Sequence, residues 1–194
     1  MKDFAGLLDR LSYTPSRNDK LRLLADYFAT APDPDRGYAL AALTDGLFFR
    51  LPLRRILTEL LASRVDPVLF DLSRDYVGDT AETIALIWPA KTETAEPPRL
   101  ATVVEMVQSA LAMEVPSLLA GWLDRLDATG RWALLKLLTG ALRVGVSARL
   151  AKTALAEWSG QPLTEIEEVW HGLKPPYLPL FAWLSAQGRR VCPP

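Results

Sequence analysis

Apolar residues recur at the helical period along almost the whole chain, and no stretch alternates convincingly with a period of two. The pattern is clear near the beginning, where one face of a first helix would carry Phe4, Leu7, Leu8 and Leu11. A polar segment and a second helix with the same kind of apolar face follow it. The sequence therefore predicts an all-α fold of roughly ten to twelve helices.

Proline and capping residues mark where several of these helices begin. Proline suits the first turn of a helix, because its missing amide costs nothing there. Thr14-Pro15, Asp33-Pro34 and Asp66-Pro67 are each predicted to be a cap followed by a helix start. Further helices are predicted to begin near Pro52, Asp79, Leu100, Pro116, Asp127, Ser147, Pro162 and Pro176.

One polar, proline-flanked stretch, residues 89–98, is typical of a linker. It divides the chain into two predicted helical halves, 1–88 and 99–188, which we expect to pack into one helical domain over 1–188. The ending, residues 189–194, is predicted to be the start of another linker.

Composition limits the classes of function. With 194 residues and 49% hydrophobic content, the chain can bury a core, and its single cysteine excludes a disulfide framework. A net charge of -1 and a pI near 5.9 disfavour indiscriminate polyanion binding, so any nucleic-acid binding must depend on a local patch. No apolar run reaches the length of a membrane span and no signal peptide is visible, so we expect a cytoplasmic protein without a membrane partner.

Such a patch is predicted between Ala128 and Ala156, a stretch with five basic residues and no acidic one. In its middle, Gly145 can adopt a left-handed backbone conformation and Ser147 can cap the next helix, whose first amides would attract phosphate. The alternative is an ordinary corner between two helices with solvated arginines.

Two groups of polar residues extend this hypothesis. Arg149 and Lys152 share one helix face at a spacing of three and could reach successive phosphates, which gives affinity without base specificity. Arg17, Asn18 and Lys20 lie on the polar side of the second helix start, where local capping and solvation compete with phosphate contact as their role.

No catalytic or metal-binding residue is predicted. His171 is the only histidine, so no histidine pair can hold a metal, and no serine, cysteine or lysine stands in a nucleophile motif.

Three segments share a pattern, in order along the chain. They are Thr14-Pro-Ser-Arg-Asn-Asp-Lys-Leu-Arg-Leu-Leu24, Gly78-Asp-Thr-Ala-Glu-Thr-Ile-Ala85 and, the most characteristic, Leu138-Thr-Gly-Ala-Leu-Arg-Val-Gly-Val-Ser147. Together they resemble the N-terminal DNA-binding domain of bacterial ATP-dependent DNA ligases. The first resembles the start of the second helix of that domain, and the second resembles its Gly-Asp turn before a helix.

The resemblance implies an all-helical domain that grips the minor groove on both sides of a nick, in DNA repair, recombination or replication. It implies as partners double-stranded or nicked DNA and the nucleotidyltransferase and oligonucleotide-binding-fold domains of the same ligase. It places the contacts on two segments, with the candidate residues Gly78, Asp79, Thr139, Gly140, Arg143, Gly145 and Ser147.

The resemblance also implies that this chain is inactive alone. Ligases of this family adenylate the lysine of a Lys-x-Asp-Gly motif, and the only Asp-Gly pair here, Asp45-Gly46, has Leu43 in the lysine position. ATP and magnesium are therefore expected only for a catalytic core outside this chain, to which residues 189–194 would lead. The alternative function is an all-helical protein-interaction scaffold that does not bind DNA.

Overall fold

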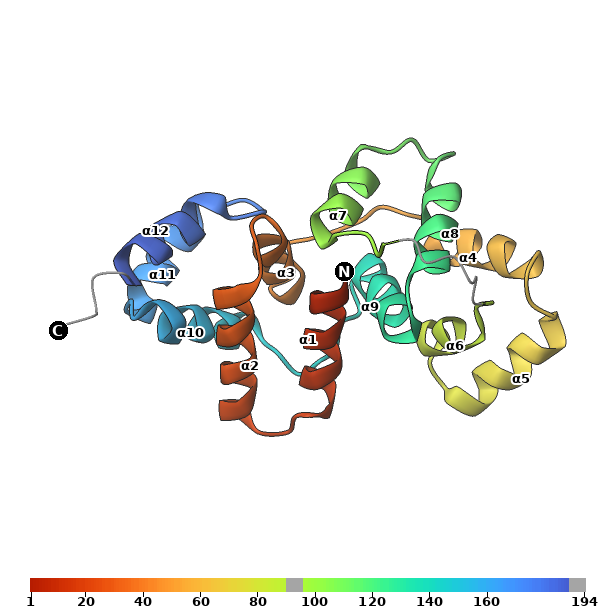
Figure 1. The fold of residues 1–194 in the computed structure, drawn as a ribbon, viewed down its shortest axis with the longest axis horizontal. Coiled ribbons are helices and arrows are strands. Elements are labelled where there is room, and N and C mark those ends of the chain that lie inside the picture. The colour runs from red at the N-terminus through yellow and green to blue at the C-terminus, as the bar shows by residue number, and fades with distance from the viewer. Residues whose placement is uncertain (90–95, 189–194) are drawn as a thin grey trace. The chain divides into compact units, whose positions relative to one another are not determined.

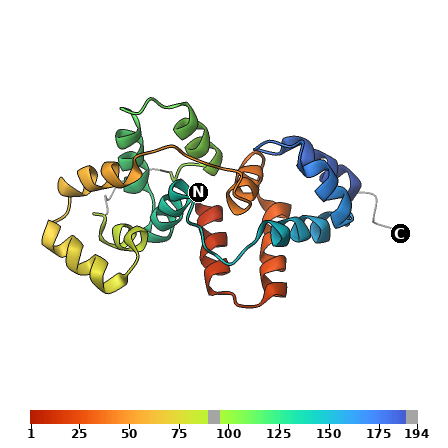
Figure 2. The same ribbon diagram turned by 180° about the vertical axis from the view of Figure 1, so that it is seen from behind.

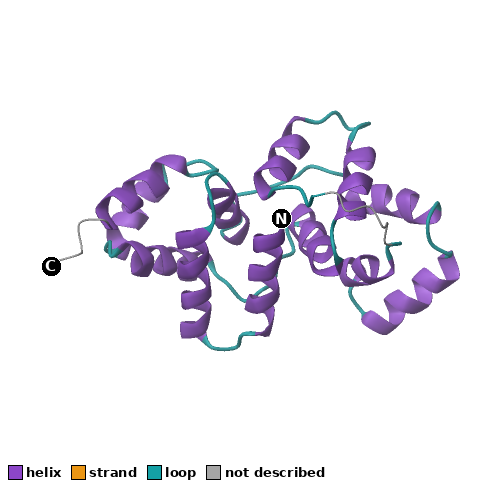
Figure 3. Ribbon diagram, in the orientation of Figure 1, coloured by secondary structure: helices purple, strands orange, loops and turns teal. Residues whose placement is uncertain are grey.

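The computed structural model describes residues 1–89 and 96–188, and within these ranges the protein is all-α, as predicted (Figure 3). The described residues form twelve helices and no strand. In chain order these are α1 (Lys2–Tyr13), α2 (Arg17–Thr30), α3 (Asp35–Leu43), α4 (Leu53–Ala62), α5 (Pro67–Val77), α6 (Thr80–Ile87), α7 (Leu100–Ser109), α8 (Val115–Arg125), α9 (Ala128–Thr139), α10 (Ala148–Ser159), α11 (Leu163–Trp170) and α12 (Leu178–Gly188). In the described part of the chain, no helix has both the length and the apolar character needed to cross a membrane.

The predicted helix starts are confirmed to within two residues. Asp66, Asp79, Asp127 and Ser147 are N-caps, and the side chain of each accepts a hydrogen bond from an amide of the following turn. Two predicted caps are wrong. Ser16 rather than Thr14 caps α2, and the N-cap position of α3 is Pro34 rather than Asp33, whose carboxylate pairs with Arg36 instead.

Two compact units make up the structure. Unit 1 consists of Met1–Gly6 and Phe49–Ala141, and unit 2 consists of Leu7–Phe48 with the chain from Leu142 onward. The units are therefore not the sequential halves 1–88 and 99–188 that the linker-like composition predicted. The reason is that α2 packs on α10, which lies more than a hundred residues away in the chain. Local composition does not indicate which distant helices pack together. Of the predicted linker, residues 90–95 lie outside the described residues, as do residues 189–194.

Unit 1 is built around the pairing of α6 with α9, and in addition α5 packs on α6 and α4 packs on α8. Its core holds large side chains such as Trp88 and Trp122, each 2% exposed. Close packing of this kind is the main source of stability of a helical unit, because the apolar face of each helix must be covered.

Unit 2 is organised around α10, which packs on α2, α3, α11 and α12. Phe28 and Phe181 are fully buried at its centre, with ring centroids 5.9 Å apart. The guanidinium of Arg36 lies 4.5 Å from the Phe181 ring centroid and is held by Asp33 at 2.7 Å. This packing holds α2 and α10, whose first turns carry the candidate residues Arg17, Asn18, Lys20 and Arg149.

Candidate nucleic-acid interface

A hollow of about 640 Å3 in unit 2 gathers half of the candidate residues. Its wall comes from the start of α2, the loop before α10 and the first turn of α10, and we call it the arginine hollow. The lining residues are Pro15, Arg17, Lys20, Arg143, Gly145, Val146, Ser147, Arg149 and Leu150. No acidic residue is among these nine, so the hollow is positively charged.

Three arginines of the hollow, Arg17, Arg143 and Arg149, are exposed. Within the described residues, none of their guanidinium groups has a hydrogen bond or an ion pair with a protein group. The nearby acid on α2, Asp19, pairs instead with Arg22 at 3.2 Å. The three guanidinium groups are therefore available to an anionic ligand, and each can donate two parallel hydrogen bonds to a phosphate.

Lys20 differs from these arginines because its ammonium group already donates hydrogen bonds within the protein. Its Nζ atom donates hydrogen bonds to the carbonyl oxygen of Val144 at 2.7 Å and to that of Gly145 at 3.2 Å. These contacts tie the loop before α10 to the first turn of α2. The sequence left capping, solvation and phosphate contact open for Lys20, and the structure adds a fourth role, the positioning of the loop.

The loop that Lys20 holds has an unusual backbone. Gly145 has a φ of 67°, as the sequence predicted, and Arg143 has a φ of 44°, which was not predicted. A left-handed conformation costs an L-residue about 1–2 kcal/mol, so other contacts must offset it at Arg143. A Cβ atom at Gly145 would collide with the Nζ atom of Lys20, so a larger residue here would displace this lysine and would also oppose the positive φ.

Two helix N-termini open on the arginine hollow. Arg17 is the first residue of α2, and Ser147 caps α10 with its Oγ accepting a hydrogen bond from the Leu150 amide at 3.2 Å. The first amides of a helix have no partner within the helix, and the helix dipole is positive at that end. Both helices thus add to the attraction for anions that the arginines create.

Two other candidate residues of unit 2, Asn18 and Lys152, do not line the hollow. The Nζ atom of Lys152 lies 4.6 Å from the centroid of the Trp170 ring, a cation–π contact that directs it toward α11. Arg149 lines the hollow, whereas Lys152, one turn along the same helix, lies against Trp170 outside it. Asn18 is exposed on the first turn of α2.

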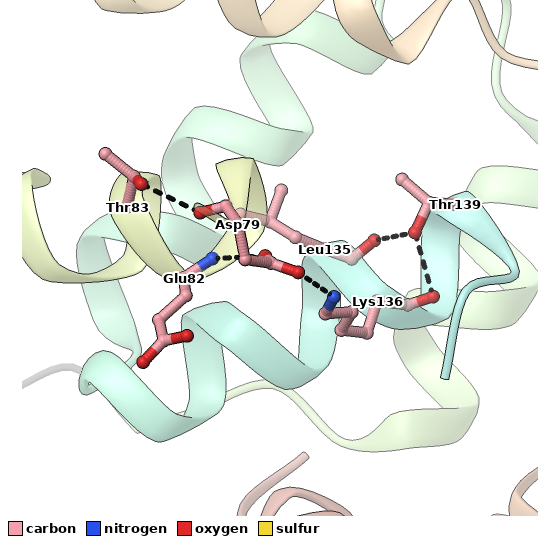
Figure 4. Close-up of polar contacts among 6 residues, drawn as sticks. All are labelled: Asp79, Glu82, Thr83, Leu135, Lys136 and Thr139. Atoms are coloured by element: carbon pink, nitrogen blue, oxygen red, sulfur yellow. Dashed lines mark hydrogen bonds and ion pairs between the residues drawn. The ribbon is translucent and has the colours of Figure 1, made fainter. Parts of the chain in front are cut away.

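The remaining candidates belong to unit 1, where Gly78 and Asp79 form the turn between α5 and α6 (Figure 4). Gly78 is exposed with a φ of 77°. The carboxylate of Asp79 accepts a hydrogen bond from the Glu82 amide at 3.0 Å and forms an ion pair with the Lys136 Nζ atom at 2.5 Å. Asp79 therefore fastens the Gly78 turn to α9.

The ionisation of Asp79 follows from these contacts. Partial burial raises the pKa of its carboxyl, but the hydrogen bonds from Lys136 and from the Glu82 amide, with the charge of Lys136, lower it more. The net pKa lies below the ordinary aspartate value, so the group is a carboxylate at neutral pH. A carboxylate repels phosphate, and this one already supports its turn through the Glu82 amide and Lys136.

Thr139 and Gly140 lie at the exposed end of α9, one turn after Lys136. The Thr139 hydroxyl donates a hydrogen bond to the Leu135 carbonyl oxygen at 2.9 Å, and Gly140 ends the helix with a φ of 68°. Apart from each glycine itself and its chain neighbours, no described atom lies within 4 Å of where a Cβ atom would stand on Gly78 or Gly140. Each backbone is thus open to close approach by a ligand.

The basic stretch from Ala128 to Ala156 does not form one surface, contrary to the sequence-based expectation. Arg131 is 7% exposed and donates hydrogen bonds to the carbonyl oxygens of Leu123 at 2.7 Å and Trp88 at 3.2 Å. Burial lowers its pKa, and nearby acidic charges offset only part of that effect. Lys136 is paired with Asp79. Only the part of the stretch in unit 2 leaves arginines exposed in a hollow.

No group of three or more histidine, cysteine, aspartate or glutamate side chains that could hold a metal ion occurs in residues 1–89 and 96–188. No protein-family model matches this chain, and no curated protein matches its sequence. The arginine hollow and the two open glycine turns are therefore the features of this chain that indicate a function.

Proposed function

We propose that the chain binds duplex or nicked DNA through its phosphate backbone, without sequence preference, and that the arginine hollow is the principal contact. The observation that carries this proposal is the convergence of three unpaired arginines and two helix N-termini on one hollow without an acidic lining residue. The resemblance of three segments to the DNA-binding domain of ATP-dependent DNA ligases supports it independently. Three positively charged groups in one small region suit successive phosphates of one strand.

The same groups explain why binding should tolerate any sequence. Guanidinium groups and helix amides that contact phosphate fix the position of a protein on DNA but do not distinguish one base from another. In the proposed complex the exposed glycine turns of unit 1, at Gly78 and Gly140, add backbone contacts to the sugar-phosphate surface. Asp79 holds the first of these turns in place and does not itself contact the DNA.

Ligation chemistry is assigned to other domains in this proposal. The Lys-x-Asp-Gly lysine that would carry the adenylate is absent from the sequence. A nucleotidyltransferase domain with ATP and magnesium, and an oligonucleotide-binding-fold domain, would supply the reaction and close around the DNA. The chain would hold the nicked duplex for them in repair, recombination or replication.

The test is the fluorescence anisotropy of a labelled nicked duplex, titrated with the chain at low and moderate salt. Binding should weaken with salt, with a slope of log affinity against log salt of about -0.9 for each phosphate neutralised. Arg143→Ala should weaken binding by about 1–2 kcal/mol, which is the range of a charge-assisted hydrogen bond.

The matched control is Arg22→Ala, which removes an exposed arginine of the same unit that already pairs with Asp19. It should leave the affinity nearly unchanged. Absence of binding at low salt, or an equal loss in both variants, would contradict the proposal. An intact duplex in parallel measures how much preference for the nick this chain carries alone.

A further inference from the structure

Helix α5 presents an apolar face to solvent. Val68, Leu69, Leu72 and Tyr76 are 67%, 54%, 66% and 93% exposed, and none of the residues of α5, all of them described, is buried. Three of the four follow one another at a spacing of four, so they form a row along one side of the helix. We call this row the apolar stripe. Isolated exposed apolar residues are ordinary, but a contiguous row of this kind marks a contact surface.

The neighbouring helix α4 shows that this exposure is not a property of short helices. α4 is also amphipathic and is one residue shorter, yet its apolar residues Leu53, Ile56, Leu57 and Leu61 are at most 8% exposed. α5 lies at the periphery of unit 1 in both ribbon views, in yellow (Figures 1 and 2). It packs on α6, and the half-buried residues Phe70, Ser73 and Val77 lie on the side of the helix away from the stripe.

The stripe is held as a regular helix at both ends. Asp66 caps α5, its Oδ1 atom accepting hydrogen bonds from the amides of Val68 at 2.9 Å and Leu69 at 3.0 Å. At the other end Gly78 takes a left-handed conformation and its amide donates to the Arg74 carbonyl oxygen at 2.8 Å. A partner would therefore meet a preformed row of side chains, which lowers the entropy cost of binding.

One border of the stripe is acidic. Asp71 and Asp75 lie one helical turn apart, beside Val68 and Leu72, and their side chains are 64% and 74% exposed. Arg74 is the only cation paired with them in the described residues, at 3.5 and 3.7 Å. One arginine cannot neutralise two carboxylates, so a net negative charge remains along this border.

We propose that the apolar stripe of α5 docks an amphipathic helix of another protein, whose apolar face is bordered by lysine or arginine residues. A second helix can pack closely against such a row, because ridges of side chains on each helix fit into the grooves of the other. Basic residues on the partner would meet Asp71 and Asp75 and fix its orientation. A single helix face is small, so the contact should be reversible.

The probe for this proposal is a labelled synthetic helical peptide of about 18 residues, long enough to form a helix, with leucines on one face and lysines along its border. A control peptide has the same sequence with glutamate in place of every lysine. Binding of each peptide to the whole chain is measured by anisotropy without DNA, so the result does not depend on DNA binding. The chain should prefer the lysine peptide by about tenfold or more, because the charges on the two borders are opposite.

Variants locate the contact. Leu72→Ser with Tyr76→Ser should weaken lysine-peptide binding by about tenfold, since both residues lie in the row that the partner covers. Leu111→Ser with Met113→Ser, which removes two exposed apolar residues elsewhere in unit 1, should not change it. Asp71→Asn with Asp75→Asn should abolish the preference for the lysine peptide. All six side chains are exposed, and circular dichroism checks that each variant stays folded.

Equal binding of the two peptides, or equal loss in the stripe and control variants, would overturn the proposal. Sedimentation of the chain alone tests whether the apolar stripe is covered by a second copy of the same chain. Dimerisation that Leu72→Ser abolishes would assign the stripe to self-association and also overturn it. A monomer with the predicted peptide pattern would support it.

Discussion

Units 1 and 2 use the cations of one basic stretch in opposite ways. In unit 1 the guanidinium of Arg131 is bound to backbone carbonyls and Lys136 is bound to Asp79, so both stabilise the interior. In unit 2 Arg143 and Arg149 stay exposed beside Arg17 in a hollow without acidic lining residues. A count of charges along a sequence is therefore not a measure of the charge that a surface presents.

The exposed apolar residues differ in arrangement. Both units enclose large aromatic side chains, such as Phe28 and Phe181 in unit 2 and Trp88 and Trp122 in unit 1, and unit 1 also carries the exposed apolar stripe of α5. We infer a division of roles, in which the arginines of unit 2 attract a polyanion, and unit 1 adds backbone contacts to DNA and offers a protein contact through α5. The following predictions test this division, beginning with the largest expected effect.

Loss of Arg131 should damage stability rather than binding. Arg131→Ala leaves the carbonyl oxygens of Leu123 and Trp88 without their donor inside unit 1, so the free energy of unfolding should fall by about 3 kcal/mol. Urea denaturation measures this loss. The control Arg125→Ala, an exposed arginine of α8, should cost less than about 0.5 kcal/mol. Similar losses in the two variants would mean that Arg131 is not a structural residue.

A β-branched residue at Gly145 should reduce DNA affinity by about 2 kcal/mol, because it opposes the left-handed backbone and displaces Lys20. Gly160→Val is a matched control. Gly160 has a φ of 71°, close to the 67° of Gly145, but no described atom lies within 4 Å of its Cβ position and it does not line the hollow. Both variants should lose stability, and only Gly145→Val should lose DNA binding. Retained affinity in Gly145→Val would remove the loop from the interface.

A double-mutant cycle tests whether Lys20 acts through the loop. If Lys20 positions Arg143 through the Val144 and Gly145 carbonyls, Lys20→Met should add little to the effect of Arg143→Ala. The coupling energy between the two changes should be about 1 kcal/mol. Additive losses in DNA affinity would instead identify Lys20 as an independent phosphate contact. Amide hydrogen exchange of residues 144–147 without DNA provides a second measure and should rise in Lys20→Met.

The smallest expected effect concerns Asp79. Because folding lowers its pKa, its charge contributes stability above the ordinary aspartate pKa, and this contribution is lost as pH falls through the lowered value. Asp79→Asn keeps a capping side chain and removes the charge, so it should cost about 0.5 kcal/mol near neutral pH. The difference from the unaltered protein should shrink as pH falls below the ordinary aspartate pKa and disappear once the Asp79 carboxyl is protonated in the folded protein. A difference that persists at low pH would show that the charge is not its source.

Local features of this fold could be predicted from the sequence, and long-range ones could not. The cap at Asp66 and the cap at Ser147 depend only on a side chain and the next three residues, and both are where the pattern predicted them. The left-handed turn at Gly145 was predicted for the same reason. The pairing of α2 with α10 depends on residues more than a hundred positions apart, so the linker-like composition misplaced the division of the chain.

The candidate site shows the same limit. Arg131 and Arg143 belong to one basic stretch of the sequence. Nothing in the neighbouring residues indicates that the first side chain is buried and the second is exposed. The bond from Lys20 to the Val144 carbonyl joins residues far apart in the chain and could not be predicted. The exposure of α5 could not be predicted either, because its sequence has the amphipathic pattern of a helix that packs normally.

The central claim is that the three arginines of the hollow carry the attraction for DNA. The most direct test is the salt dependence of nicked-duplex binding by two triple variants that remove the same charge. One variant replaces Arg17, Arg143 and Arg149 with alanine, and the other replaces Arg22, Arg55 and Arg74, which are exposed but paired with carboxylates. The slope of log affinity against log salt should become about 2.7 units less steep in the first variant, at about 0.9 for each lost phosphate contact, and stay nearly unchanged in the second. Equal changes in the two variants would mean that total charge, and not the hollow, governs binding, and would contradict the account.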